Sequence, residues 1–119
     1  MNFNFNNDIP IYIQLVEQLK IYIISGKLNL GEKLPSVRDL ALQTKVNPNT
    51  VQKALGELED MNLIYTERTN GKYVTNNNKL IEKYKNEYIK IETEKYLKHM
   101  DDLGINKDEI LEYLKGGNK

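Results

Sequence analysis

Two helix-start signals in close succession constrain this fold more than any other feature of the sequence. The pair Pro35–Ser36 forms the first signal, since the proline disfavours a helix before it and the serine hydroxyl can accept from a backbone N–H of the next turn. The pair Asn47–Pro48 forms the second, with the asparagine as N-cap and the proline at the first helical position. The sequence therefore predicts short helices over about residues 37–43 and 48–61.

The second of these helices separates apolar from polar side chains. Helical spacing builds an apolar face from Val51, Ala54, Leu55, Leu58 and Met61. The opposite face carries Asn49, Gln52 and Lys53. An amide side chain can both donate to and accept from an adenine edge in the major groove, whereas lysine suits phosphates. We therefore expect a helix-turn-helix that packs through one face and reads A·T-containing DNA with the other.

Elements on both sides complete a winged helix-turn-helix. Apolar residues recur at helical spacing over Ile9–Ile23, and Gly26 supplies a stop. After the second short helix, residues 63–66 and 72–75 are β-prone and enclose Asn70–Gly71, a strong hairpin signal. In a winged helix-turn-helix the third helix enters the major groove, and the wing approaches the backbone or the minor groove.

Positive charge is concentrated where this motif lies. The chain has 17 basic and 17 acidic residues, and its formal net charge of zero argues against coating of nucleic acid through bulk electrostatics. From Lys33 to Lys53, however, four positive side chains stand against Asp39 alone. Any DNA contact must therefore be locally organised.

Residues suited to catalysis or metal binding are sparse. The chain has no cysteine, which excludes disulfides and thiolate metal sites, and its sole histidine, His99, sits among charged residues without a second ligand nearby. The carboxylates are dispersed over predicted helices, so no nucleophile and base can be assembled. We therefore expect no enzyme activity, no metal and no cofactor.

The sequence predicts neither a membrane span nor a signal peptide. The longest apolar cluster, around Ile21–Ile24, is far too short to cross a bilayer, and residues 1–8 are polar and rich in asparagine. The expected location is the cytoplasm.

Residues 77–119 form a second predicted unit. An apolar stripe drifts around a helix of about six turns, Gly104 ends that helix, and Asn106–Glu109 is typical of a capping box that opens a short final helix. A small winged domain cannot cover this stripe, so we expect the tail to pair two copies of the chain. The expected dimer interface consists of Tyr84, Tyr88, Ile91, Tyr96, Met100 and Leu103. The alternative is a monomer whose tail folds back on its own body.

Pairing of two copies has consequences for DNA binding and for regulation. Two recognition helices related by a two-fold axis would read an inverted repeat, so the expected partner is double-stranded DNA with a palindromic operator. Two helices of this size hardly enclose a ligand pocket within one subunit. An unidentified small-molecule effector would therefore need a site between subunits, or between the tail and the DNA-binding domain.

The order of these motifs resembles the GntR family of bacterial transcription regulators. The resemblance covers residues 10–76 and rests on Gly31–Ala41, on Val46–Val51, and on Gly71 in a hairpin that closes on Tyr73–Val74. The Val46–Val51 phrase is similar to the YtrA subfamily, whose members are commonly associated with transporter operons.

The resemblance implies roles for individual residues. Arg38 would contact a phosphate or a guanine edge, although it could instead merely pair with Asp39 or a neighbouring carboxylate. Lys45 stands where the family usually has a glycine, and Asn70 stands where the wing often carries a basic residue. The full expected DNA interface comprises Lys33, Ser36, Arg38, Asn47, Asn49, Thr50, Gln52, Lys53, Arg68, Thr69, Asn70, Gly71 and Lys72.

Together these inferences predict a mainly α fold with a small β-hairpin. A winged helix-turn-helix DNA-binding domain is expected over residues 1–76 and a two-helix dimerisation tail over residues 77–119. The predicted function is a sequence-specific transcription regulator, a homodimeric repressor that binds an inverted-repeat operator. The alternative is a winged-helix module whose third helix docks a protein, which an exposed apolar stripe on that helix would have favoured.

Overall fold

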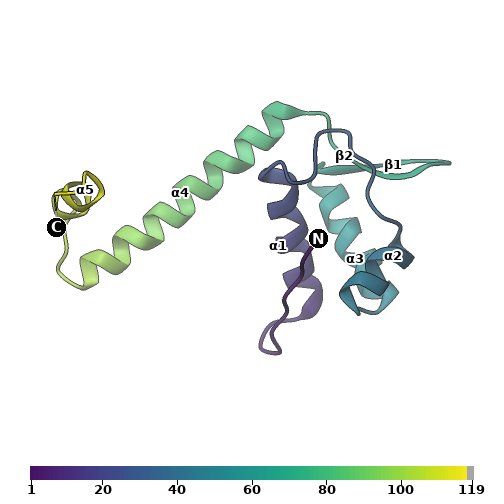
Figure 1. The fold of residues 1–119 in the computed structure, drawn as a ribbon, viewed down its shortest axis with the longest axis horizontal. Helices are drawn as coiled ribbons and strands as arrows, with labels where there is room; N and C mark the ends of the chain where they lie inside the picture. Colours follow the sequence, from purple (N-terminus) through teal and green to yellow (C-terminus); the bar gives the residue numbers. More distant parts are fainter. Residues whose placement is uncertain (118–119) are drawn as a thin grey trace. The chain divides into compact units, whose positions relative to one another are not determined.

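The computed structural model describes residues 1–117, which form five helices and one antiparallel hairpin (Figure 1). In chain order the elements are α1 (Ile11–Ile24), α2 (Val37–Thr44), α3 (Pro48–Asp60), β1 (Ile64–Glu67), β2 (Gly71–Val74), α4 (Asn78–Asp102) and α5 (Lys107–Leu114). The predicted mainly α fold with a small hairpin is therefore confirmed.

The core of the winged-helix part lies where α1 and α2 pack on α3 (Figure 1). Leu19 of α1, Leu40 of α2 and Leu55 of α3 are all completely buried. Burial of each such side chain stabilises the fold by about 1.5–3 kcal/mol. Because these contacts hold the inner face of α3, its outer face is fixed in orientation and stays open to a ligand.

Local capping starts α2 and α3 where the sequence predicts. The Ser36 hydroxyl accepts from the backbone N–H of Asp39 at 3.0 Å, and the Asn47 side chain accepts from the N–H of Asn49 at 2.8 Å. Pro48 occupies the first turn of α3, where the missing N–H breaks no helical bond. Both helix starts are therefore set by residues within one turn of them.

Lys45 ends α2 in the left-handed backbone conformation, with φ 57° and ψ 35°. A side chain that bears a Cβ is strained there, whereas glycine is not. We expect Lys45→Gly to raise the free energy of unfolding by about 1 kcal/mol, measured by chemical denaturation. Asn62, with φ 62°, is the matched control. Asparagine tolerates the left-handed conformation, so Asn62→Gly should raise the free energy of unfolding by less. An unchanged or lowered stability of Lys45→Gly would contradict the expected strain.

The connector between α1 and α2 (residues 25–36) pairs with the outer edge of the wing, which the sequence did not indicate. The strands β1 and β2 pair with Ile64 opposite Val74, and Lys33 bridges Tyr73 on the other side of β2. The N–H of Leu34 donates to the Lys72 carbonyl at 2.8 Å, and the N–H of Val74 donates to the Glu32 carbonyl at 2.8 Å. The wing is thereby attached to the segment that leads into the helix-turn-helix.

The polar N-terminal segment lies along α1 in a regular ladder of hydrogen bonds. Three side chains of α1 each form two hydrogen bonds with the backbone of every second residue of this segment, donating to its carbonyl and accepting from its N–H. The pairs, with the distances in that order, are Gln14 with Asn6 (2.8 and 2.9 Å), Gln18 with Asn4 (2.6 and 3.2 Å) and Tyr22 with Asn2 (2.9 and 2.7 Å). The two repeats match, because four helical residues rise about 6 Å and two extended residues about 6.6 Å. Phe3 also contacts the Tyr22 ring, with the centroids 5.8 Å apart.

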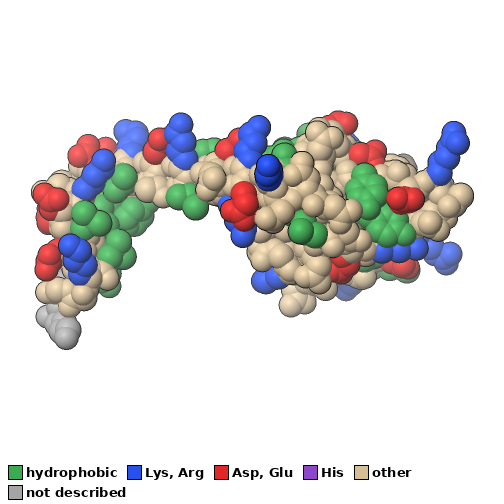
Figure 2. Space-filling view, turned by 90° about the horizontal axis from the view of Figure 1, so that it is seen from above, with side chains coloured by type: hydrophobic (Ala, Val, Ile, Leu, Met, Phe, Trp, Pro, Cys, Tyr) green, Lys and Arg blue, Asp and Glu red, His purple; other side chains and the backbone are tan. Residues whose placement is uncertain are grey.

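The chain divides into two compact units, and the division lies inside α4, after Glu82. The first turn of α4 belongs with the winged helix, since Ile81 is buried there. In the second unit, Asn106 and Glu109 form the predicted capping box at the start of α5. Figure 2 shows green apolar side chains gathered among charged ones along α4 and α5, toward the left of the view. None of the helices in residues 1–117 is both long and apolar enough for a membrane crossing.

Candidate nucleic-acid interface

The outer face of α3 presents three polar side chains that are free of the core. Asn49, Gln52 and Lys53 are exposed, whereas Thr50 is half-buried. Asn47 is exposed as well, but its side-chain oxygen already caps the helix. An exposed amide on a rigid, capped helix can form the paired donor and acceptor contacts that distinguish a base pair.

The start of α2 supplies a cation that no carboxylate of residues 1–117 neutralises. Arg38 is exposed and forms no ion pair within residues 1–117, so the alternative in which it pairs with Asp39 is not realised. The hydroxyl of neighbouring Ser36 accepts from the backbone and can still donate its own proton. This end of α2 therefore offers a guanidinium and a hydroxyl to an anionic ligand.

The tip of the wing is exposed and adjoins the connector. Residues 68–70 join β1 to β2. Gly71, which opens β2, has φ 105°, a conformation that favours glycine. The Cε atom of Lys33 lies 3.5 Å from the place that a Cβ on Gly71 would occupy. The structure thus brings Lys33 to the wing, although the two are far apart in the sequence.

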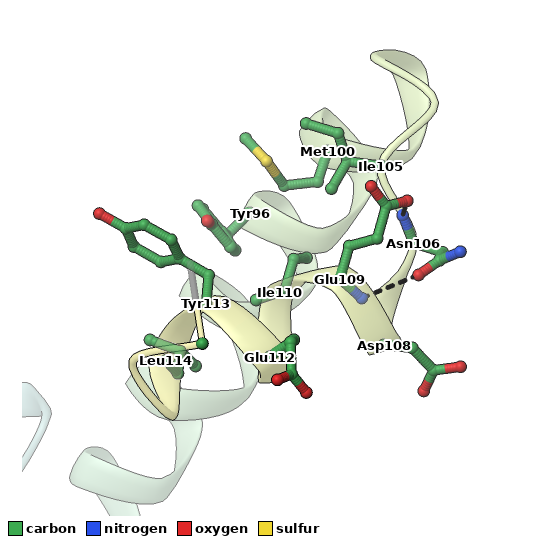
Figure 3. Close-up of a pocket in the computed structure, with 11 residues that line it drawn as sticks. Tyr96, Met100, Ile105, Asn106, Asp108, Glu109, Ile110, Glu112, Tyr113 and Leu114 are labelled. Atoms are coloured by element: carbon green, nitrogen blue, oxygen red, sulfur yellow. Dashed lines mark hydrogen bonds between the residues drawn. The ribbon is translucent and has the colours of Figure 1, made fainter. Parts of the chain in front are cut away.

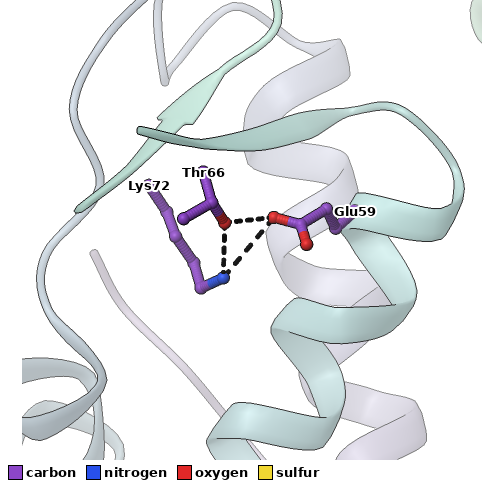
Figure 4. Close-up of polar contacts among 3 residues, drawn as sticks. All are labelled: Glu59, Thr66 and Lys72. Atoms are coloured by element: carbon purple, nitrogen blue, oxygen red, sulfur yellow. Dashed lines mark hydrogen bonds and ion pairs between the residues drawn. The ribbon is translucent and has the colours of Figure 1, made fainter. Parts of the chain in front are cut away.

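Lys72 lies against α3 instead of projecting freely from the wing (Figure 4). Its ammonium is 3.5 Å from the Glu59 carboxylate and donates to the Thr66 hydroxyl at 2.9 Å, and Thr66 in turn donates to Glu59. Only 19% of the Lys72 side chain is exposed. Glu59 was not predicted from the sequence, and its contact with Lys72 compensates the charge that was expected at a phosphate.

The hydrogen bond from the Thr66 hydroxyl is the main cause that lowers the pKa of Glu59 below its ordinary value of 4.5; burial opposes this effect, and the Lys72 ammonium adds to it. A lowered pKa in the folded state means that the carboxylate stabilises the fold above pH 4.5 and loses this effect as the pH falls through the folded-state pKa. We expect Glu59→Gln to cost below about 1 kcal/mol near neutral pH, because the group is partly exposed.

The same substitution should have a smaller effect at acid pH. Denaturation of both proteins from pH 7 to below pH 4 measures the difference in unfolding free energy, which should shrink below pH 4.5. A constant difference across this range would show that the ionised carboxylate is not what holds the wing.

Lys53 contacts a residue that the sequence analysis did not single out for the interface. Its ammonium lies 3.7 Å from the ring centroid of Tyr12, which stands in the first turn of α1. The helices α1 and α3 pack together, so this contact follows from tertiary structure. Within residues 1–117 there is no cluster of side chains able to hold a metal ion.

The comparisons with known proteins agree with this geometry. The model of the family "Bacterial regulatory proteins, gntR family" matches residues 11–74. The uncharacterized HTH-type transcriptional regulator YhcF of Bacillus subtilis is 36% identical over 115 residues, which span 97% of this chain and 95% of that protein. The HTH-type transcriptional repressor YtrA of the same organism is 47% identical over 70 residues, 59% of this chain and 54% of that protein.

One solved structure is similar over nearly the whole chain and another over a part of it. A GntR family transcriptional regulator from Listeria monocytogenes has a TM-score of 0.86 at 42% identity, covering 94% of this chain and 98% of that one. AraR(DBD) in complex with operator ORX1 has a TM-score of 0.58 at 28% identity, covering 63% of this chain and 96% of that one.

Proposed function

This chain belongs to the gntR family of bacterial regulatory proteins and is a DNA-binding regulator of transcription, and on that premise we propose that it is a homodimeric repressor of an inverted-repeat operator. The observation that carries the proposal is the capped helix α3, which is held by its buried face and presents Asn49, Gln52 and Lys53 outward. The exposed face has no apolar stripe, which disfavours the alternative of a protein-docking module.

In the proposed complex the residues divide between reading bases and binding phosphates. Asn49 and Gln52 read base edges in the major groove, since their amides can form paired contacts. The phosphate contacts come from Lys53, Arg38 and Lys33 together with the hydroxyls of Ser36 and Thr50, and the wing tip at Arg68, Thr69, Asn70 and Gly71 lies along the adjacent backbone. Asn47 and Lys72 act mainly by fixing α3 and the wing.

Exposed apolar residues on α4 and α5 support the proposed dimer. Between residues 83 and 117 no side chain is buried, and this includes the large apolar side chains. Ile91, Tyr96 and Leu103 are 50%, 50% and 60% exposed. Two helices without a buried core gain stability only by covering their apolar faces. We infer that the partner is a second copy, because lysines and carboxylates are interspersed along this segment, so an identical surface can offer opposite charges to it.

A groove between α4 and α5 gives the proposed dimer a place to insert side chains (Figure 3). The groove has a volume of about 890 Å³, and Tyr96, Met100 and Tyr113 line it. Side chains of a partner would fill such an open groove, and any effector that binds between subunits would compete with them for it.

The repressor assignment rests on relatives. YtrA and NagR of Bacillus subtilis are both named transcriptional repressors, at 47% and 40% identity over 70 and 75 residues. We propose that this chain likewise occludes a promoter. A reporter promoter that contains the bound sequence should lose transcription when the full chain is expressed, and increased transcription would contradict repression.

Selection of bound fragments from random duplex DNA tests the proposal most directly. The expected product is an inverted repeat with A·T pairs in each half-site, because amide side chains read adenine. Failure to enrich any sequence would contradict specific binding. Enrichment of one unrepeated site would contradict only the two-fold arrangement.

A further inference from the structure

The ammonium of Lys53 rests on the ring of Tyr12, at 3.7 Å from its centroid. Lys53 is exposed on the outer face of α3, whereas Tyr12 is half-buried in the first turn of α1. A tyrosine ring held in this way offers its negative π face at a fixed position, because packing between α1 and α3 restricts it. Lys53 is therefore held toward α1 although its own stem is flexible.

In the described part of the chain no carboxylate pairs with this lysine. Glu57 stands one turn further along α3, but Lys53 forms no ion pair within residues 1–117. Lys72 shows the opposite arrangement, since the Glu59 carboxylate neutralises it. An aromatic face attracts a cation without cancelling its charge, and it leaves part of the ammonium and its N–H donors uncovered. Lys53 is thus oriented without a carboxylate of residues 1–117 offsetting its charge.

We propose that Tyr12 is a positioning residue of the DNA interface, whose ring holds the Lys53 ammonium ready for a phosphate oxygen. This inference rests on the proposed function, in which Lys53 binds the DNA backbone. A free lysine loses rotamer freedom when it binds a phosphate. A lysine already held on a ring loses less, so the contact with Tyr12 strengthens DNA binding without Tyr12 reading any base.

Four variants of the full chain test this inference: Tyr12→Phe, Tyr12→Leu, Lys53→Met and the double variant Tyr12→Leu/Lys53→Met. Binding is measured on the duplex obtained by selection and on a mixed-sequence duplex. Tyr12→Leu should weaken binding to both by about two- to five-fold, whereas Tyr12→Phe keeps the ring and should stay within about two-fold of the unmodified chain. In the Lys53→Met background, the Tyr12→Leu substitution should have no further effect.

Different outcomes separate this inference from the proposed function. If Lys53→Met leaves binding unchanged, Lys53 is not a DNA contact and that part of the proposed function fails. If Lys53→Met weakens binding but Tyr12→Leu does not, or if Tyr12→Leu still weakens binding when Lys53 is absent, the positioning role is overturned.

A measurement on the unmodified chain guards against misfolded variants. A lysine over a ring has side-chain protons shifted upfield in NMR spectra by the ring current. We expect this shift for Lys53 in the free chain, retained in Tyr12→Phe. Unshifted Lys53 protons would overturn the inference whatever the variants do.

Discussion

Replacement of Gln52 by alanine is expected to lower the affinity for the selected operator duplex by about ten-fold or more while leaving binding to mixed-sequence DNA almost unchanged. A paired amide contact discriminates a base pair by about 1–3 kcal/mol, and alanine can make neither of its hydrogen bonds. Gln52 is exposed and supports no part of the core, so its loss should not disturb the fold. Asn49→Ala should behave in the same way, because Asn49 contributes only its backbone N–H to the helix cap.

Titration of both duplexes at one fixed salt concentration measures this effect. Gln43→Ala is the matched control, because Gln43 is exposed on α2 and is not part of the proposed interface. Equal losses on the selected and mixed-sequence duplexes would contradict base reading by Gln52 and would indicate a contact with the phosphate backbone instead.

The helix-turn-helix could be predicted because its determinants are local. Ser36 and Asn47 each satisfy a backbone N–H within three residues, so the sequence alone fixes where α2 and α3 begin. The capping box of Asn106 and Glu109 is equally local. Lys45 stands where the resemblance implies a glycine, and its left-handed backbone shows why glycine suits this position.

Contacts between distant segments could not be predicted in this way. The sequence predicts Lys72 as a phosphate ligand, but in the folded chain its ammonium lies beside the Glu59 carboxylate. The sequence likewise gives no partner for Lys53, whose ammonium lies on the Tyr12 ring because α1 packs against α3. The side chains that form the hydrogen-bond ladder, Gln14, Gln18 and Tyr22, are four residues apart in the sequence. This spacing does not predict the ladder, because it is typical of any helix face. Only packing decides what such side chains contact.

Burial explains why the tail is the part that most needs a partner. In the winged helix, Leu19 and Leu55 are completely inaccessible to solvent, so this part has its own core. From residue 83 to residue 117, by contrast, no side chain is buried. In the proposed dimer, burial of the exposed apolar faces of α4 and α5 would supply the free energy of association, so substitutions there should be the most disruptive to it.

Ile91→Glu and Leu103→Glu are each expected to convert the proposed dimer to monomers. A carboxylate at either position would be buried without a partner on association, whereas in the monomer it remains hydrated, so the substitution destabilises only the dimer. Loss of the second recognition helix should then lower the affinity for a duplex with two half-sites by about 100-fold or more, since linked half-site binding gains roughly 10²–10⁴ in affinity. Binding to a duplex with one half-site should not change.

Sedimentation equilibrium and duplex titration of the full-length variants measure both effects. Asn86→Glu is the matched control, because it adds the same charge to α4 at an exposed polar position that is not part of the predicted interface. The control should remain dimeric, and far-ultraviolet circular dichroism should show helices in all three variants. Dimers that persist in both Ile91→Glu and Leu103→Glu, or an unmodified chain that sediments as a monomer, would show that the apolar faces of α4 and α5 do not join two copies. The inverted repeat would then lose its physical basis, because nothing else proposed for this chain relates two recognition helices by a two-fold axis.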